Sequence, residues 1–188
     1  AYGVMVPHAG YMYSGRVCGR ALASVEIPPL CVILHTKHVL GGGPLSLSQF
    51  QHWVTPLGSV PADPTLNKAL ADVPGITQSN LPHFGEHAAE VVLPFLQVLR
   101  PDVRVAIISV MSAPLELIQR AASGLAKVVL ACKEDLLLIA SSDMNHCGAC
   151  GNACPSGQHC AASACVSDTR TMIVSVSTGG VIGNGYSE

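Results

Sequence analysis

Three histidines each follow a short apolar segment, and their side chains could bind a metal or transfer a proton. His8 follows Gly3–Val6, His38 follows a second such segment, and Leu136–Ala140 leads through SSDMN to His146. Imidazole titrates close to neutral pH and is the commonest metal-ligating side chain. If these segments are neighbouring parallel strands, their carboxyl ends meet at one edge, where ligands of such sheets bind. The sequence therefore predicts that the imidazoles converge on one crevice.

Two more residues belong to this candidate crevice. His87 follows Glu86 at the predicted start of a helix, and Asp143 lies just before His146. Carboxylates among imidazoles suit acid–base work or a divalent metal. The remaining histidines are predicted to be ordinary loop, turn or tract residues, namely His35, His52, His83 and His159.

The elements that must position these residues alternate between apolar strands and helices. Continuous runs of Val, Ile and Leu predict strands buried on both faces, at Gly3–Val6, Cys31–Leu34, Val103–Val110 and Leu136–Ala140. Between them, helical spacing predicts helices at Gly15–Ser24, Glu86–Leu99 and Leu115–Leu130. This alternation predicts an α/β fold with a mostly parallel or mixed central sheet.

Proline and glycine interrupt this pattern in two places. Pro94 should kink the helix predicted at Glu86–Leu99 or restart it as a first-turn residue. Residues Leu40–Pro64 are rich in both residue types and predict a long loop with at most one edge strand.

Composition excludes two classes of partner. The chain has 188 residues, which suits one globular unit, and a net charge of −2 without a cluster of Lys or Arg. Nucleic-acid affinity depends on neutralising phosphates, so we expect no nucleic-acid partner. The apolar runs are far shorter than the roughly 20 residues of a membrane span, and we expect no membrane segment. A cytoplasmic location is the expectation.

The eight cysteines fall into two groups. Cys18, Cys31 and Cys132 have apolar neighbours and are predicted to be core residues. The other five crowd into a tract of small and turn-forming residues, at Cys147, Cys150, Cys154, Cys160 and Cys165. Such a tract is held by disulfides or by metal, and its spacing leaves both open; disulfides would need an oxidising compartment.

Four segments together resemble the Memo-like family, also called AmmeMemoRadiSam system protein B. They are VPHAGYMYSG at Val6–Gly15, VILHTKH at Val32–His38, EHAAEVVLPFLQ at Glu86–Gln97 and SSDMNH at Ser141–His146, and WVTPLGSV at Trp53–Val60 fits the same order. The resemblance predicts a Memo-like domain over 1–146, without some N- and C-terminal parts of the family's domain. A cysteine-rich tract over 147–166 and a final strand and turn over 167–188 would follow it.

The resemblance implies a three-layer α/β/α fold similar to class III extradiol dioxygenases. By their places in the motifs, His8 and His38 would be metal ligands, and His87, Asp143 and His146 would be catalytic residues around the metal. The implied cofactor is iron or copper, with zinc as a further option. The family's usual Gly-Pro-Asn or Gly-Pro-Ser before the second histidine is replaced here by His35-Thr36-Lys37.

Three functions remain open at this point. The first is a metal-dependent oxidoreductase of the dioxygenase type, acting on a small molecule. The second is a non-catalytic binding or adaptor protein with a protein partner, and the third is a hydrolase that uses a metal-activated water. The resemblance also implies a functional link to a radical SAM protein.

Overall fold

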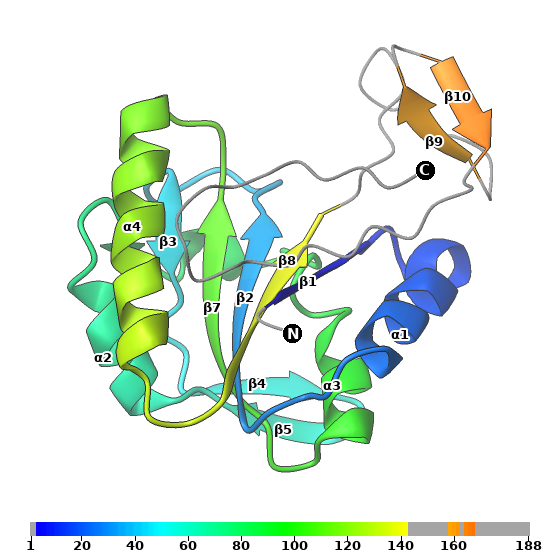
Figure 1. Ribbon diagram of the computed structural model, residues 1–188, viewed down its shortest axis with the longest axis horizontal. Coiled ribbons are helices and arrows are strands. Elements are labelled where there is room, and N and C mark those ends of the chain that lie inside the picture. Colours follow the sequence, from blue (N-terminus) through cyan, green and yellow to red (C-terminus); the bar gives the residue numbers. More distant parts are fainter. Residues whose placement is uncertain (1–2, 143–157, 162–163, 168–188) are drawn as a thin grey trace.

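A six-stranded central sheet organises the protein in the computed structural model, which describes residues 3–142, 158–161 and 164–167 (Figure 1). In spatial order the strands are β1 (Gly3–Val6), β8 (Leu136–Ser141), β2 (Leu30–Thr36), β7 (Arg104–Val110), β3 (Leu45–Leu47) and β6 (Thr77–Gln78). The first four are parallel to one another, and β3 is antiparallel to β7. The prediction of a mostly parallel or mixed sheet is confirmed.

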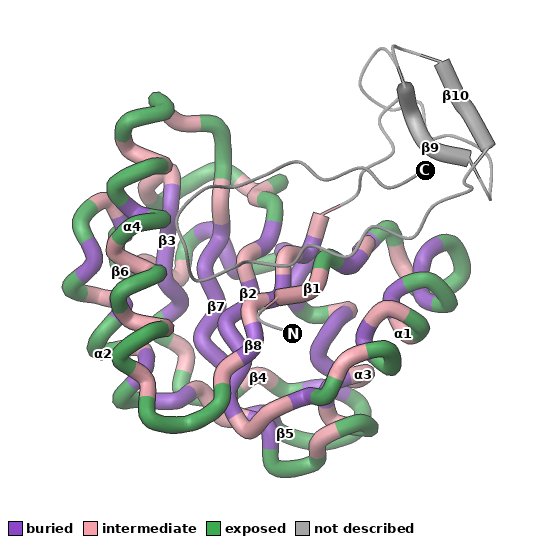
Figure 2. Tube along the Cα trace, viewed as in Figure 1, coloured by how far each residue is buried: buried purple, intermediate pink, exposed green. Residues whose placement is uncertain are grey.

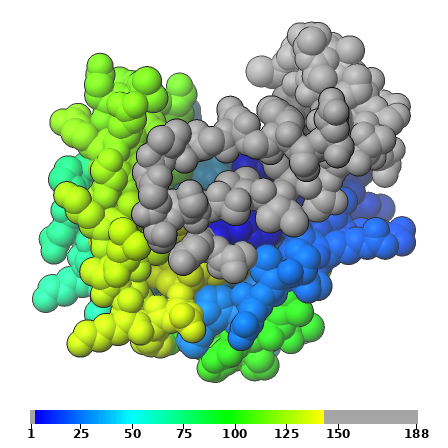
Figure 3. Space-filling view, in the orientation of Figure 1, coloured from blue at the N-terminus to red at the C-terminus, as the bar shows by residue number. Residues whose placement is uncertain are grey.

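Helices cover both faces of the sheet and complete a three-layer α/β/α fold. One face carries α1 (Arg16–Ala23), which continues from a π-helical turn at Tyr11–Gly15, and α3 (Leu93–Leu99); the other carries α2 (Pro64–Ala71) and α4 (Leu115–Ala131) (Figure 1). A hairpin of β4 (His52–Thr55) and β5 (Gly58–Pro61) packs with the α1–α3 layer. In the space-filling view, α1 in blue and α4 in yellow-green form opposite sides of the molecule (Figure 3).

The sheet is apolar along most of its length and becomes polar at its carboxyl end. On the α1–α3 face, β2, β7 and β8 align their side chains in rows because their parallel registers are in phase. The last of these rows is polar and consists of His35, Ser109 and Ser141. Two buried apolar rows precede it, formed by Cys31, Val105 and Leu137 and by Ile33, Ile107 and Ile139. The strands β2 and β7 are accordingly drawn largely in purple, the colour of buried residues (Figure 2).

The prediction of a loop with at most one strand over Leu40–Pro64 is wrong. The segment contains β3, β4 and β5. These strands have only three or four residues each, too few to show a period of two in the sequence. Gly58, with φ of 118°, occupies a backbone conformation at the β4–β5 turn that glycine adopts without strain.

The structure also tests the predictions for the helix around Pro94 and for the three scattered cysteines. The helix expected at Glu86–Leu99 starts only at Leu93, with Pro94 in its first turn, which confirms the restart. Cys18 and Cys31 are buried as expected, whereas Cys132 caps the end of α4 and is only half-buried, because the helix ends at the surface there.

The C-terminal part is described only as a hairpin, in which β9 (Gln158–Ala161) pairs antiparallel with β10 (Ala164–Ser167). The predicted site residues Asp143 and His146 lie outside the described residues, as do Cys147, Cys150 and Cys154 and the final strand and turn. Within the part of the chain that is described, no helix is both long and apolar enough to cross a membrane.

Truncation of Leu96 should show how strongly α3 contributes to stability. Its side chain is fully buried, whereas Val98 on the same helix is 71% exposed. Leu96→Ala should lower the free energy of unfolding by about 2–5 kcal/mol through lost burial and a residual cavity. Val98→Ala, the matched control, should change it by less than about 0.5 kcal/mol. Urea unfolding measures both, and equal losses would contradict the described packing of α3.

Candidate metal centre

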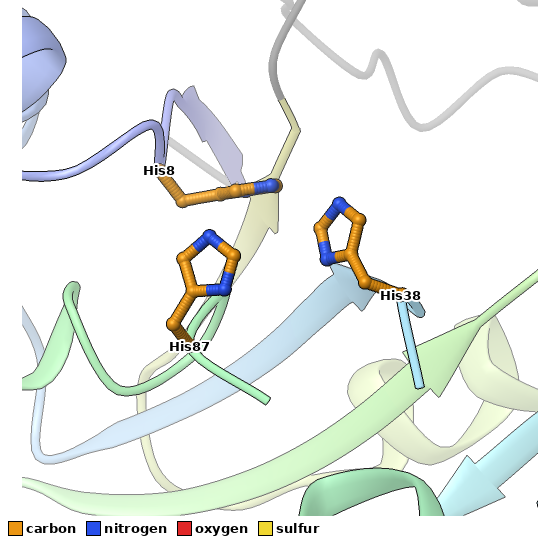
Figure 4. A group of neighbouring side chains, drawn as sticks. All are labelled: His8, His38 and His87. Atoms are coloured by element: carbon orange, nitrogen blue, oxygen red, sulfur yellow. The ribbon is translucent and has the colours of Figure 1, made fainter. Parts of the chain in front are cut away.

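Three imidazoles meet at the carboxyl edge of the sheet. His8 lies two residues after β1, His38 two residues after β2, and His87 in the segment that leads into α3. One ligand atom from each ring lies within 4.8 Å of the ligand atoms of the other two (Figure 4). The predicted convergence of His8 and His38 follows from the fold, because β1 and β2 are parallel strands on either side of β8.

The three rings differ in their access to solvent. The rings of His38 and His87 are nearly parallel, with their centroids 5.3 Å apart. The ring of His8 stands edge-on to both of them. His8 is only 1% exposed, whereas His38 and His87 are exposed. The cluster therefore has a buried side formed by His8 and an open side through which a small molecule can approach.

Ser141 at the end of β8 fixes the tautomer of His8. Its hydroxyl donates to the carbonyl oxygen of Ala88, at 2.5 Å, and so has no second hydrogen to offer. The contact of 2.8 Å between Ser141 Oγ and His8 Nδ1 must then be an N–H donated by the ring. In the neutral ring, Nε2 of His8 is then the nitrogen with the lone pair, and a neutral imidazole binds a metal through that nitrogen.

Glu86 orients His38 in the same way. Its Oε1 accepts from His38 Nδ1 at 2.9 Å and from the Ala88 N–H at 3.0 Å, and its Oε2 accepts from the His38 N–H at 2.7 Å. Burial opposes ionisation of this carboxyl group, but the hydrogen bonds outweigh it and lower its pKa to about 2. The buried carboxylate thus accepts the N–H at Nδ1 of His38, and in the neutral ring Nε2 is again the nitrogen with the lone pair. The His87 Nδ1 lies 3.5 Å from the same Oε1.

A second pair of imidazoles lies beside this cluster. His35 Nε2 and His83 Nδ1 are 3.2 Å apart, and both residues are buried. Burial lowers the pKa of His35, and it lowers that of His83 to about 4. The rings of Trp53 and Phe50 stand edge-on to His83. Both histidines were expected to be ordinary residues, and the sequence gives no sign of the pairing because 48 positions separate them.

Other sequence signals have mixed outcomes. His87 was expected beside the metal rather than as a ligand, yet its ring offers a ligand atom equivalent to those of His8 and His38. Ser141 was not expected to act; its position at the end of an apolar strand was the available signal.

Comparison with known proteins identifies the family of this chain. A family model described as Memo-like protein matches residues 1–173. The chain belongs to the Memo-like family. Relatives called MEMO1 family proteins include those of Sulfurisphaera tokodaii, 39% identical over 149 residues, Aquifex aeolicus, 35% over 144, and Caldivirga maquilingensis, 34% over 147.

These alignments cover 76% of this chain and 52–53% of each of the three relatives. The chain therefore spans about half the length of the relatives it matches. The resemblance found in the sequence motifs is confirmed at the level of the family. The proposed boundary after residue 146 stays a prediction.

Removing the Ser141 hydroxyl should free the His8 ring to adopt either tautomer. In Ser141→Ala we expect the Nδ1-protonated form of His8 to lose its dominance, because the hydroxyl oxygen that accepts from Nδ1 is removed. Imidazole ¹⁵N shifts of labelled protein measure the tautomer, and Ser142→Ala, at the neighbouring position, is the control. An unchanged His8 tautomer in Ser141→Ala would show that another group determines it.

The buried His83 should make stability depend on pH. Its pKa is about 4 in the folded protein against 6.5 for an unperturbed histidine, so between these values the unfolded chain binds more protons. Stability should therefore fall as pH decreases from about 6.5 to 4, and this fall should be smaller in His83→Gln. Urea unfolding with a metal chelator present measures it, with the exposed His52→Gln as control. Equal pH slopes for all three proteins would contradict the buried neutral ring.

Proposed function

We propose that this protein binds a redox-active metal, iron or copper, at His8, His38 and His87 and acts as an oxidoreductase on a small molecule. The observation that carries this proposal is the approach of three imidazole ligand atoms to within 4.8 Å of one another at the end of the sheet. Ser141 and Glu86 accept from Nδ1 of His8 and of His38, which in the neutral rings leaves the lone pair on Nε2. Such second-sphere hydrogen bonds are usual for metal-binding histidines.

The donor set fits the metal class. Neutral imidazoles suit Fe, Cu, Ni and Zn, and the three rings would leave coordination positions on the exposed side of the cluster. When bound there, iron or copper would supply a position for O₂ or substrate and a change of oxidation state. His8 would bind the metal from its buried side, and His38 and His87 would bind it from the side that is exposed to solvent.

The protein's own residues would orient ligands and manage protons. Glu86, with a pKa of about 2, stays ionised at neutral pH and serves to position His38 rather than to transfer a proton. The resemblance assigns proton transfer to Asp143 and His146, which follow β8 in sequence. We retain that assignment as part of the proposal.

A binding protein without turnover is the second candidate. Exposed apolar side chains flank the cluster along the chain, namely Leu40 after His38 and Leu81 and Phe84 before His87, each at least 60% exposed. Exposed apolar residues close in sequence to the candidate metal ligands favour a protein partner. This candidate predicts an intact fold that binds a partner without a redox metal.

Metal analysis distinguishes the two candidates. Anaerobically purified protein should contain iron or copper near one ion per chain, and the double variant His8→Ala, His38→Ala should lose it because two of three ligands are removed. Elemental analysis measures the content, and His52→Gln, an exposed histidine outside the cluster, should retain the metal. Zinc retained by the double variant would place the metal in the cysteine tract, and protein without metal would favour the binding candidate.

A further inference from the structure

Helix α4 has apolar side chains on two of its sides, and the sheet covers only one of them. The covered side packs against the core and consists of Leu117, Ile118, Ala121, Leu125 and Val128. Among the 17 residues of this fully described helix only Ala121 is buried, and Figure 2 draws the helix mainly in green and pink. The second side, called the outer stripe below, faces solvent and consists of Leu115, Ala122, Ala126 and Leu130.

The spacing of the outer stripe keeps its members on one side of the helix. They follow one another at intervals of seven, four and four residues, which return to the same side of an α-helix. Leu115 and Leu130 are 68% and 75% exposed, and the two alanines between them are exposed as well. Gln119 adds one polar side chain to this side. An apolar stripe along a whole surface helix is typical of an interface with another protein surface.

The outer stripe is complementary to itself. Its large side chains lie near the two ends of the helix, and its small side chains lie in the middle. If a second copy of α4 packs against it in the antiparallel direction, Leu115 lies opposite Leu130 of the second copy, and the alanines meet near the two-fold axis. Small side chains at the contact let two helix axes approach to about 8 Å. A symmetric pair of these helices therefore buries the whole stripe.

The charges beside the outer stripe favour the same antiparallel pairing. Glu116 and Lys127 line one shallow hollow of about 410 Å³ on a flank of the stripe, and neither forms an ion pair with another residue in the described ranges. In an antiparallel pair with two-fold symmetry, the same flank of each helix meets that of the other. In the register that places the leucines opposite each other, Glu116 is two residues, or about 3 Å along the axis, from the level of Lys127 of the second copy. The two-fold axis repeats this contact, so two pairs of opposite charges form.

We propose that α4 is the interface of a homodimer, in which the two copies of the helix pack antiparallel along the outer stripe. Burial of the apolar stripe drives the association. The pairs of Glu116 with Lys127 of the second copy set its direction and register, as flanking charges do in coiled coils. A parallel pair would bring opposite flanks together and separate these charges. The proposal is independent of the function proposed for the three histidines.

This dimer leaves both candidate metal centres open. Helix α4 follows β7 and begins at the carboxyl edge of the sheet, which is also the edge at which the three histidines lie. Antiparallel packing of α4 directs the carboxyl edges of the two copies toward opposite ends of the dimer. Association and metal binding can therefore be measured separately.

A substitution in the middle of the outer stripe tests the interface. Sedimentation velocity of the full chain under reducing conditions should show a dimer. Ala126→Arg should sediment as a monomer, because the long side chain holds the helices apart and places like charges across the two-fold axis. Ala69→Arg, at an exposed alanine of α2, is the matched control and should remain dimeric. Both variants should keep the circular dichroism spectrum and the metal content of the wild type.

An exchange of charges tests the direction of packing. Glu116→Lys alone and Lys127→Glu alone each place like charges opposite one another twice, and each should weaken the dimer about tenfold. In an equal mixture of the two variants, a mixed dimer regains both pairs of opposite charges. The mixture should therefore associate about as tightly as the wild type. Arg120, on the same flank, is unchanged in all of these proteins.

Three results would overturn the proposal. The first is a wild-type chain that stays monomeric at concentrations up to about 1 mM, where even weak association becomes visible. The second is a dimer that persists in Ala126→Arg, since its interface would then lie elsewhere. The third is a mixture of the two charge variants that associates no more tightly than either variant alone, which would exclude the antiparallel pairing of α4.

Discussion

The parallel register of β1, β8, β2 and β7 is the constraint on which both groups of histidines depend. Because these strands are in phase, two apolar rows end in the row of His35, Ser109 and Ser141 at one edge of the sheet. Ser141 in that row orients His8, which follows the adjacent strand β1. A slip of one residue would turn the row to the opposite face and separate these contacts. The apolar rows therefore determine the geometry of the site as well as the stability of the fold.

Glu86 connects the carboxyl edge of the sheet to the segment that leads into α3. A buried carboxylate is costly unless it is hydrogen-bonded, and three N–H groups satisfy this one. Those groups belong to His38, after β2, and to Ala88, before α3, so the carboxylate ties two segments that are distant in sequence. It also supplies the negative charge beside His35 and His83. A single ionised side chain thus sets the orientation of one imidazole group and the electrostatic environment of the other.

Sequence reasoning succeeded where one segment carries enough information by itself. The strands β2 and β7 were predicted from apolar runs and are buried on both faces as expected. The strands β1 and β8 were also predicted, but they are only partly buried, so the expectation of burial on both faces is wrong for them. The convergence of His8 and His38 follows from parallel strand ends. It failed where a feature depends on contacts between distant segments. The short strands β3–β5 are stabilised by pairing rather than by pattern, and the approach of His83 to His35 depends on how a turn folds onto the sheet.

The buried position of His35 makes physical sense only together with His83. An imidazole in the last row of the sheet is buried among strands and needs partners for both nitrogens. The Thr36 carbonyl oxygen satisfies one, and the ring of His83 faces the other. His83 is in turn held by the Ser46 carbonyl oxygen, which belongs to β3 on the far side of β7. Ser109, between them in register, keeps a buried hydroxyl without a hydrogen-bond partner among the described residues. The polar edge of the sheet therefore keeps one unsatisfied hydroxyl among the described residues, and the free-energy cost of that hydroxyl must be offset by the apolar rows that precede it.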